Sequence, residues 1–232
     1  MDAVLNDFDA YLRAFGFTLW LFLISGVLSL ILGTFLVALR VGPVAVLRSA
    51  AATYVTVVRN TPLVIVFATF QFTAPTLWSA LNFRWFDRLD ISIGQFQFNQ
   101  FFATAVIALT LYTSTFVCEA LRSGVNSVDI GQAEAARAIG LPFGGVMTNV
   151  VLPQAFRASL PPLASVQIAL IKNTSVAAVF GVAEAVYQMR SLTRDFPSQL
   201  NEIFIAFAIG YIIIVEVTSF LSNRLERRWR VA

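Results

Sequence analysis

The stretch FGFTLWLFLISGVLSLILGTFLVAL, residues 15–39, carries no charged side chain along its 25 residues. An α-helix needs about 20 consecutive apolar residues to cross the hydrocarbon core of a bilayer. The stretch therefore predicts a membrane-spanning helix near the N-terminus. A cleaved secretory signal would begin with basic residues and have a shorter apolar core, whereas residues 1–14 contain three acids and one arginine. We therefore expect this helix to be retained.

The composition of the whole chain extends this prediction. Hydrophobic residues make up 58% of the 232 residues and charged residues only 12%, whereas a soluble domain has about 25% charged residues. Such a chain cannot bury its apolar surface in one soluble core, so the bilayer is its expected solvent. The absence of histidine and the single cysteine, Cys118, exclude an internal disulfide and argue against a zinc or haem centre. We expect this chain to bind no metal and no cofactor.

Four further apolar runs are as long as a span. They occupy about 57–80, 101–118, 158–181 and 203–222. Backbone groups that face lipid must be paired internally, which favours a helix for each run. The predicted fold class is an all-α integral membrane protein with five transmembrane helices. A single domain is expected over residues 15–222, preceded by a short segment at 1–14 and followed by a basic tail at 223–232.

The arginines are distributed unequally between the two sides of the membrane. Five spans would place the two chain ends on opposite sides, and one side then carries ten arginines: Arg40, Arg48, Arg59, Arg122, Arg137, Arg157, Arg224, Arg227, Arg228 and Arg230. The other side carries five arginines together with eight acids. Basic loops stay in the cytoplasm. We therefore expect an outside N-terminus and a cytoplasmic tail, with the connection 119–157 also in the cytoplasm.

That connection contains the polar stretch GQAEAARAIG, residues 131–140. Asp129 is positioned to cap a helix that begins at Ile130, and Gln132 has the spacing of a capping box. Gly140 and Pro142 are expected to end the helix. A helix of about ten residues is not stable alone in water, so it needs a surface to lie against.

Two surfaces are possible for this helix. A helix that lies on lipid headgroups should have a face rich in lysine and arginine and an opposite face of bulky apolar residues. The stretch has alanine at four positions instead, with Glu134 and Arg137 as its only charges. Such a thin helix lets another protein approach its backbone closely. We therefore favour docking onto a soluble partner over contact with headgroups alone.

The residues of this stretch also carry a family resemblance. Glu134-Ala135-Ala136, then Gly140, then Val150 and Leu152-Pro153 resemble the EAA signature of ABC-importer permeases, with valine at 150 where isoleucine is usual. The flanking runs VRNTPLVIVF and LIKNTSVAAVFGVAE resemble the polar amino-acid branch, which includes permeases for glutamate, glutamine, histidine and basic amino acids. Within it, LYTSTFVCEALRSGVNSV is most similar to the glutamate-uptake members. The resemblance covers about residues 15–222.

The resemblance implies a type I ABC importer (MetI-like) transmembrane fold in the plasma membrane. It implies that the segment 129–153 forms a coupling helix docked on a cytoplasmic ATPase dimer, which would bind ATP and Mg. The implied coupling residues are Gln132, Glu134, Ala135, Ala136, Arg137, Gly140 and Leu141. A second permease subunit, either a related chain or a copy of this one, would complete the pore, and an extracytoplasmic substrate-binding protein would deliver a polar amino acid, with glutamate favoured. The chain itself has no G-x-x-x-x-G-K-[ST] run and is not expected to be an enzyme or to bind nucleic acid.

Lys172, the only lysine, is the most informative candidate in the substrate path. A charge inside a span is costly and usually faces a cavity or a partner, and an ammonium group suits the carboxylate of an amino acid. It could instead pair with Glu119, Glu216 or freed carbonyls, or lie nearer a membrane face. The other candidates are polar neighbours of Lys172 and of Pro62, namely Asn173, Thr174, Ser175, Arg59, Asn60 and Thr61. These groups could bind substrate, bond neighbouring helices or, for Arg59, anchor a span by its charge.

Two other classes of membrane protein compete with this interpretation. An ion-coupled secondary carrier would work without an ATPase, but such carriers commonly contain inverted repeats. Five spans cannot be divided into two equal repeats, and the helix at 131–140 would have no role in such a carrier. The third class is a channel or assembly subunit that moves no substrate of its own.

Overall fold

The computed structural model describes residues 2–229 of the chain, so Arg230 and the end of the predicted basic tail lie outside the described residues. The elements before the third long helix are α1 Asp2–Asn6, α2 Phe8–Val41, α3 Ala45–Asn60, α4 Leu63–Ala68, η1 Thr69–Thr73, α5 Ala74–Leu77, η2 Ser79–Asn82, α6 Arg84–Asp87, β1 Ser92–Ile93 and β2 Phe96–Gln97. The remaining elements are α7 Gln100–Asn126, α8 Ile130–Ala138, α9 Phe143–Val146, η3 Met147–Val151, α10 Leu152–Asn173, η4 Thr174–Phe180, α11 Ala185–Asp195, η5 Pro197–Gln199 and α12 Leu200–Trp229.

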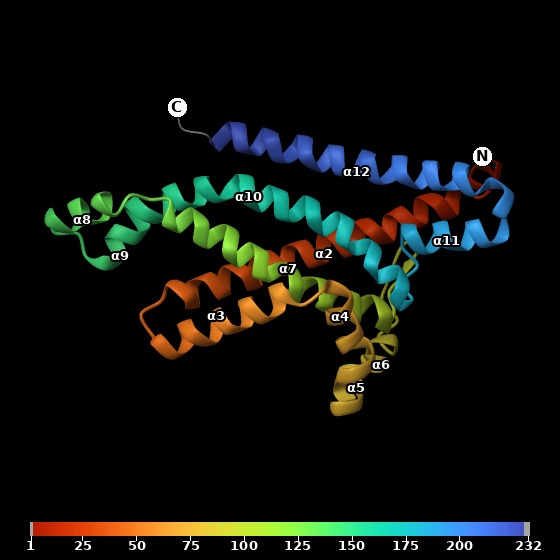
Figure 1. The fold of residues 1–232 in the computed structure, drawn as a ribbon, viewed down its shortest axis with the longest axis horizontal. Helices are drawn as coiled ribbons and strands as arrows, with labels where there is room; N and C mark the ends of the chain where they lie inside the picture. Colours follow the sequence, from red (N-terminus) through yellow and green to blue (C-terminus); the bar gives the residue numbers. More distant parts are fainter. Residues whose placement is uncertain (1, 230–232) are drawn as a thin grey trace.

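Long helices dominate the structure, which is elongated (Figure 1). Within residues 2–229, four helical stretches are long and apolar enough to span a membrane: Phe8–Val41, Gln100–Asn126, Phe143–Phe180 and Pro197–Arg228. A fifth span is obtained when the bent pair Ala45–Asn60 and Leu63–Leu77 is counted as one. The prediction of an all-α membrane protein with five spans is confirmed in this form.

The second span differs from the expected continuous helix over about 57–80. Its two parts meet at a bend of 107°. Pro62 lacks a backbone N–H and disfavours helical geometry at the preceding residue, and Thr61 is accordingly extended, with φ −88° and ψ 130°. The chain therefore forms an elbow between α3 and α4, where Pro62 becomes the N-cap of the second helix.

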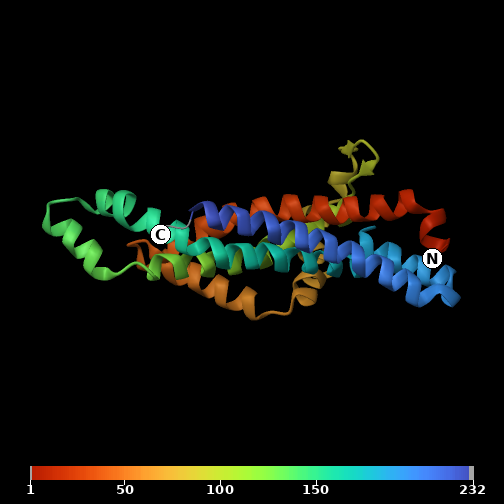
Figure 2. The ribbon, with the colours of Figure 1, turned by 90° about the horizontal axis from the view of Figure 1, so that it is seen from above.

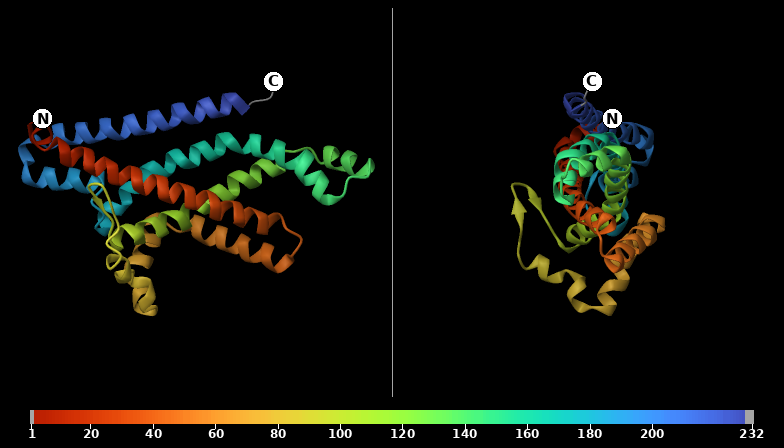
Figure 3. Two further views of the ribbon diagram at one scale, coloured as in Figure 1. Left: turned by 180° about the vertical axis from the view of Figure 1, so that it is seen from behind. Right: turned by 90° about the vertical axis from the view of Figure 1, so that its left-hand side faces the viewer.

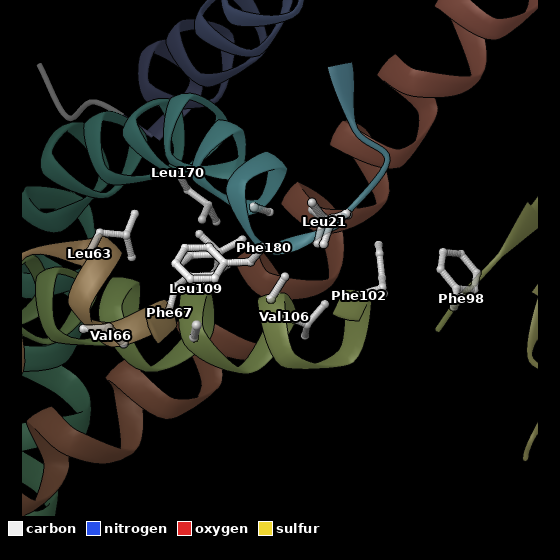
Figure 4. Packing of buried hydrophobic residues seen from close by; sticks show 14 residues of the cluster. Leu21, Leu63, Val66, Phe67, Phe98, Phe102, Val106, Leu109, Leu170 and Phe180 are labelled. Atoms are coloured by element: carbon white, nitrogen blue, oxygen red, sulfur yellow. The ribbon is translucent and has the colours of Figure 1, made fainter. Parts of the chain in front are cut away.

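The core lies where α2, α7 and α10 cross (Figures 1 and 2). Its buried side chains include Leu21, Leu109 and Leu170, one from each of these helices. Phe67 of α4 and Phe180 of η4 complete it as stacked rings whose centroids are 5.1 Å apart (Figure 4). The elbow at Pro62 thus brings the second half of the broken span into the core.

Two glycines allow α7 to approach both neighbouring helices closely. A Cβ atom on Gly33 of α2 would lie 2.4 Å from Cγ1 of Val117, and one on Gly124 of α7 would lie 2.0 Å from Oγ of Ser159 in α10. Real Cβ atoms do not come this close to other heavy atoms, so both positions require glycine. Small residues at such crossings are typical of membrane helices, which gain stability mainly from close packing.

The two ends of the long axis differ in character. The hairpin of α8 and α9 projects at one end, and α1 and α11 lie at the other (Figure 2). The backbone of the segment with α6 and the two short antiparallel strands loops out beside the bundle, as the right-hand view of Figure 3 shows. The Phe96 ring of β2 nevertheless packs on Phe17 of α2, with ring centroids 5.2 Å apart. α12 runs back along the bundle toward the α8 end. The helical bundle thus has one projecting tip and, at its opposite end, a second group of short helices.

A buried carboxylate joins three helices at the α11 end. Glu184 is fully buried and caps α11 by accepting a hydrogen bond from the Tyr187 N–H at 3.0 Å. The Tyr211 hydroxyl of α12 donates to it at 2.8 Å, and the Thr18 hydroxyl of α2 lies 3.4 Å away. Thr18 also accepts from the Ala185 N–H at 3.2 Å. Burial raises the pKa of the Glu184 carboxyl from 4.5 to about 7, against the lowering effect of these bonds.

The raised pKa predicts that stability falls as pH rises. The folded protein keeps the Glu184 proton that the unfolded chain loses above about pH 4.5, so the contribution is present at low pH and is lost as pH rises through about 7. We expect the thermal midpoint of the purified protein to fall between about pH 5 and about pH 8, by the equivalent of roughly 3 kcal/mol at most. Glu184→Gln should remove this slope.

The control is Asp9→Asn, which neutralises an exposed acid in the same protein. It should keep the slope of the unmodified chain when unfolding is followed by intrinsic fluorescence. A Glu184→Gln variant with the same pH slope as its parent would contradict the prediction.

Candidate functional site

The helix predicted at 131–140 is present as α8. It begins at Ile130, and the Asp129 carboxylate accepts a hydrogen bond from the Gly131 N–H at 2.7 Å, as an N-cap does. Gln132 does not complete the expected capping box. Its side-chain oxygen accepts a hydrogen bond from the Gln154 amide at 2.6 Å. α10 begins beside α8, and its glutamine thus engages the side chain that would otherwise reach back to the cap.

Glycine ends α8 as expected. Gly140 has φ +88°, in the left-handed region that favours glycine. Its N–H donates to the Arg137 carbonyl at 2.9 Å, and the Leu141 N–H donates to the Ala136 carbonyl at 3.2 Å. This pair of bonds is the Schellman motif, which satisfies the last carbonyls of the helix. The chain then turns back toward the bundle through α9, η3 and α10.

The surface that supports α8 comes from the same chain. Ala136 is buried with Val146 and Val151 in a small cluster separate from the main core, and Leu141 packs against it. Two of the seven predicted coupling residues, Ala136 and Leu141, therefore contribute to the internal packing of the tip. Because its inner face is covered, α8 can stand outside the bundle (Figure 1).

The outer face of α8 is open. The other predicted coupling residues lie on it or beside it as exposed positions, namely Gln132, Glu134, Ala135, Arg137 and Gly140. The structure adds three bulky apolar side chains that the sequence analysis did not single out, Ile130, Ile139 and Phe143, which are 74%, 81% and 66% exposed. Their positions immediately beside both ends of the alanine-rich stretch were the available signal. The tip thus presents small, charged and apolar groups together.

A charged cluster joins the ends of α2 and α3 to α7. The Glu119 carboxylate contacts Arg40 in a very short ion pair. It also lies 3.3 Å from Nε of Arg122 and 3.7 Å from a guanidinium nitrogen of Arg59. One carboxylate thus serves three guanidinium groups, which leaves the cluster with a net positive charge. Glu119 is therefore not the partner of Lys172, and Arg59 is held at the elbow of the broken span.

Lys172 and Ser175 line a cavity of about 540 Å³ between α10 and α12. Its other lining residues are Val186, Ala208, Tyr211, Ile212, Val215 and Glu216. Among residues 2–229, no ion pair joins Lys172 to Glu216, although both face this space. An ammonium and a carboxylate group on one cavity wall are complementary to the two charges of an amino-acid backbone.

The neighbours of Lys172 point in different directions. Asn173 lines a second cavity of about 370 Å³, together with Tyr112 and Ser165. Thr174 is buried in the core, and its hydroxyl donates to the Ile171 carbonyl at 2.7 Å. The structure therefore separates the polar residues at 172–175, which follow one another in sequence, into two cavities and the core.

The candidates around Pro62 lie on another part of the fold. Asn60 ends α3, and the Thr61 hydroxyl donates to the Val57 carbonyl at 2.8 Å, one turn back. Arg59, Asn60 and Thr61 therefore form the elbow before α4, whereas Lys172 lies at the end of α10. Within the described residues no group of three or more His, Cys, Asp or Glu side chains could hold a metal ion.

The chain matches the family model described as binding-protein-dependent transport system inner membrane component over residues 29–231. It is 43% identical to the glutamate transport system permease protein GluC of Corynebacterium efficiens over 205 residues, which cover 88% of this chain and 86% of the relative. It is 30% identical to the glutamate/aspartate import permease protein GltJ of Escherichia coli over 218 residues, covering 94% and 86%.

Solved structures share its fold. A chain of an amino acid ABC transporter crystallised with histidines matches with a TM-score of 0.79 and 24% identity, over 97% of this chain and 96% of that one. A chain of the MetNI methionine ABC transporter in an inward-facing conformation matches with a TM-score of 0.70 and 17% identity, over 96% and 97%. At these identities the likeness establishes the fold, which confirms the MetI-like architecture expected from the EAA signature.

The family match covers the broken span, α8 and the cavity residues together. It confirms an integral membrane permease that is not itself an enzyme, since ATP hydrolysis in these importers is carried out by a separate subunit. It also excludes the ion-coupled carrier and the channel that the sequence left open. The chain therefore belongs to the family of binding-protein-dependent transport system inner membrane components, the permease subunits of ABC importers.

Proposed function

We propose that this chain carries a polar amino acid, with L-glutamate as the favoured substrate, across the plasma membrane of a bacterium. The observation that carries the proposal is the position of α8, whose open outer face projects from the bundle while its inner face is packed on its own chain. Such a projecting helix can receive work from a soluble ATPase. The names of the relatives GluC and GltJ support glutamate.

The assembly follows from this proposal. An ATPase dimer, which binds ATP and Mg, contacts α8 in the cytoplasm through the segment 129–153. A second permease subunit, either a related chain or a copy of this one, completes the pore, and a substrate-binding protein docks at the opposite end. ATP and the loaded binding protein can drive the pore between two states only by binding the two states unequally.

The distribution of arginines along the bundle supports the orientation. The end of α2, the start of α3 and the end of α12 lie toward the α8 end (Figure 1), and these segments carry Arg40, Arg48, Arg224, Arg227 and Arg228. The start of α2 and α11 lie at the opposite end and carry Arg13, Arg190 and Arg194. With basic groups retained in the cytoplasm, residues 1–14 lie outside, 15–222 form the transmembrane domain and 223–232 form a cytoplasmic tail.

The substrate path runs past the cavity between α10 and α12. Lys172 binds the carboxylate of the amino acid, Glu216 faces its ammonium group, and Ser175 supplies a hydroxyl group to the same space. Asn173 contributes through the adjacent cavity. Thr174 supports the segment from the core, and Arg59, Asn60 and Thr61 line the route at the elbow nearer the cytoplasm.

Reversing the charge on α8 tests the coupling role. Glu134→Lys should weaken attachment of the ATPase or separate ATP hydrolysis from uptake, because an exposed carboxylate at the contact becomes an ammonium group. We expect uptake to fall by about tenfold or more, as for the loss of a charged hydrogen bond at an interface. The measurements are co-purification of the ATPase and uptake by reconstituted vesicles.

The matched control for Glu134→Lys is Asn223→Lys, which adds a positive charge at an exposed position near the end of α12, outside the segment 129–153. It should leave coupling near the level of the unmodified importer. Normal uptake by Glu134→Lys would exclude the proposed contact at this residue.

Removing the cavity charge tests the substrate path. Lys172→Met should reduce uptake of acidic amino acids by about tenfold or more, because a hydrogen bond to a charged group contributes roughly 1.5–3 kcal/mol. The complex with the ATPase should remain intact on size-exclusion chromatography. Lys172→Arg, which keeps the charge, should retain most of the uptake, and an unchanged rate in Lys172→Met would assign the lysine a structural role.

A further inference from the structure

A third cavity, here called the α11 cavity, lies between η4 and α11. Its volume is about 260 Å³, and it is lined by Ala178, Val179, Tyr187, Arg190, Ser191 and Arg194. Four of these side chains come from α11 at helical spacings of three and four residues, so they share one face of that helix. The opposite face is occupied, since Ala185 and Leu192 are buried against α2 and α12.

The position of this face is well determined. Glu184 caps α11 and is hydrogen-bonded to the Tyr211 hydroxyl of α12, with the Thr18 hydroxyl of α2 close by. α11 therefore cannot rotate without breaking buried contacts. The two arginines consequently project from a rigid helix, a condition that favours a preformed binding site.

The charge of the cavity is not balanced from within. Arg190 and Arg194 are exposed and one helical turn apart, where like charges repel each other. No ion pair between described residues involves either of them. The Tyr187 and Ser191 side chains add hydroxyl groups between and beside them. Two guanidinium groups with adjacent hydroxyl groups are a suitable environment for a carboxylate, which arginine binds through paired hydrogen bonds.

The α11 cavity and the Lys172 cavity are lined by residues of the same two elements, η4 and α11. Val186 lines the Lys172 cavity and Tyr187, its neighbour in sequence, lines the α11 cavity. In η4, Ser175 lines the Lys172 cavity, and Ala178, one 3₁₀ turn later, lines the α11 cavity. The start of α11 and the segment η4 therefore contribute to the linings of both cavities.

The two cavities differ in the charge that they match. The Lys172 cavity also contains Glu216, so its charges suit the zwitterionic backbone that all amino acids have. The α11 cavity has two cationic groups and no acid among its lining residues, so it suits a molecule with net negative charge. Its volume is below the range of about 300–1,000 Å³ that is usual for drug-sized ligands.

We propose that the α11 cavity is a capture site for acidic amino acids at the outer mouth of the permease. Arg190 and Arg194 bind the side-chain carboxylate there before the backbone of the amino acid reaches Lys172. This inference rests on the proposed function, because it requires an importer that accepts acidic amino acids. It adds a site that selects acidic over neutral amino acids on the permease itself.

The test uses the complete complex of permease subunits and ATPase in lipid nanodiscs, without the substrate-binding protein. Binding of radiolabelled L-glutamate and of L-glutamine is measured for the parent, for Arg190→Gln/Arg194→Gln and for Arg190→Lys/Arg194→Lys. We expect the glutamine-substituted variant to lose about tenfold in glutamate affinity and less than about twofold in glutamine affinity, in line with the loss of charged hydrogen bonds. The lysine-substituted variant should retain most glutamate binding.

The matched control is Arg88→Gln, which removes an exposed positive charge at the end of α6, outside the cavity. It should leave both affinities unchanged. Equal glutamate affinity in the parent and in Arg190→Gln/Arg194→Gln would overturn the proposal. A variant that loses only its affinity for the loaded substrate-binding protein, measured separately, would also overturn it, because the arginines would then bind a carboxylate of that protein.

The parent complex distinguishes failure of this site from failure of the proposed function. If the parent complex neither binds nor transports glutamate, both the proposed function and the capture-site proposal are wrong. If the parent transports glutamate and Arg190→Gln/Arg194→Gln transports it equally well at low glutamate concentration, only the capture-site proposal is wrong.

Discussion

In the bilayer every backbone N–H and C=O group needs a partner inside the protein, and this requirement shapes the rest of the structure. It makes each apolar run helical, and it makes an interruption possible only where other parts of the protein cover it. The elbow at Pro62 is such an interruption. The second half of the broken span, which begins at Leu63, is covered by the core through Phe67 and Phe180. The polar residues 59–61 lie at this break, between the end of α3 and the start of α4.

A different constraint acts on α8, because a helix as short as this one is unstable in water unless it packs against another surface. The turn at Gly140 and the buried Ala136 fold α8 back onto α9 and η3. One face is used for this packing, so only the opposite face is available to a partner. The cluster that supports α8 is separate from the main core. The packing that stabilises the helix is therefore compatible with its proposed mechanical role.

Signals that lie close together in sequence predicted their structures well. The charge-free run at 15–39, the Asp129 cap and the Gly140 stop each depend on neighbouring residues, and the helices form where they indicate. Contacts between distant residues could not be predicted in this way. Arg40 and Glu119 are 79 positions apart, and only the crossing of α2 with α7 brings them together. In the same way, the different directions of the side chains at 172–175 depend on which helices surround η4. The stretch 131–140 has four alanines, and the sequence does not indicate that Ala136 is the one that is buried.

The placement of charge along the bundle gives a physical reason for the order of the sites. Two guanidinium groups line the α11 cavity, one ammonium group and a carboxylate line the Lys172 cavity, and a net positive cluster around Glu119 joins the ends of α2 and α3 to α7. An anion that bound one strong cationic site in a medium of low dielectric constant would be released slowly, since charge interactions strengthen as water is excluded. In the proposed path, Glu216 offsets the attraction of Lys172 for a net negative ligand, because both groups line the same cavity. Under the capture-site proposal, an outer site that selects for charge, followed by this balanced site, would allow selection at the mouth and release farther in.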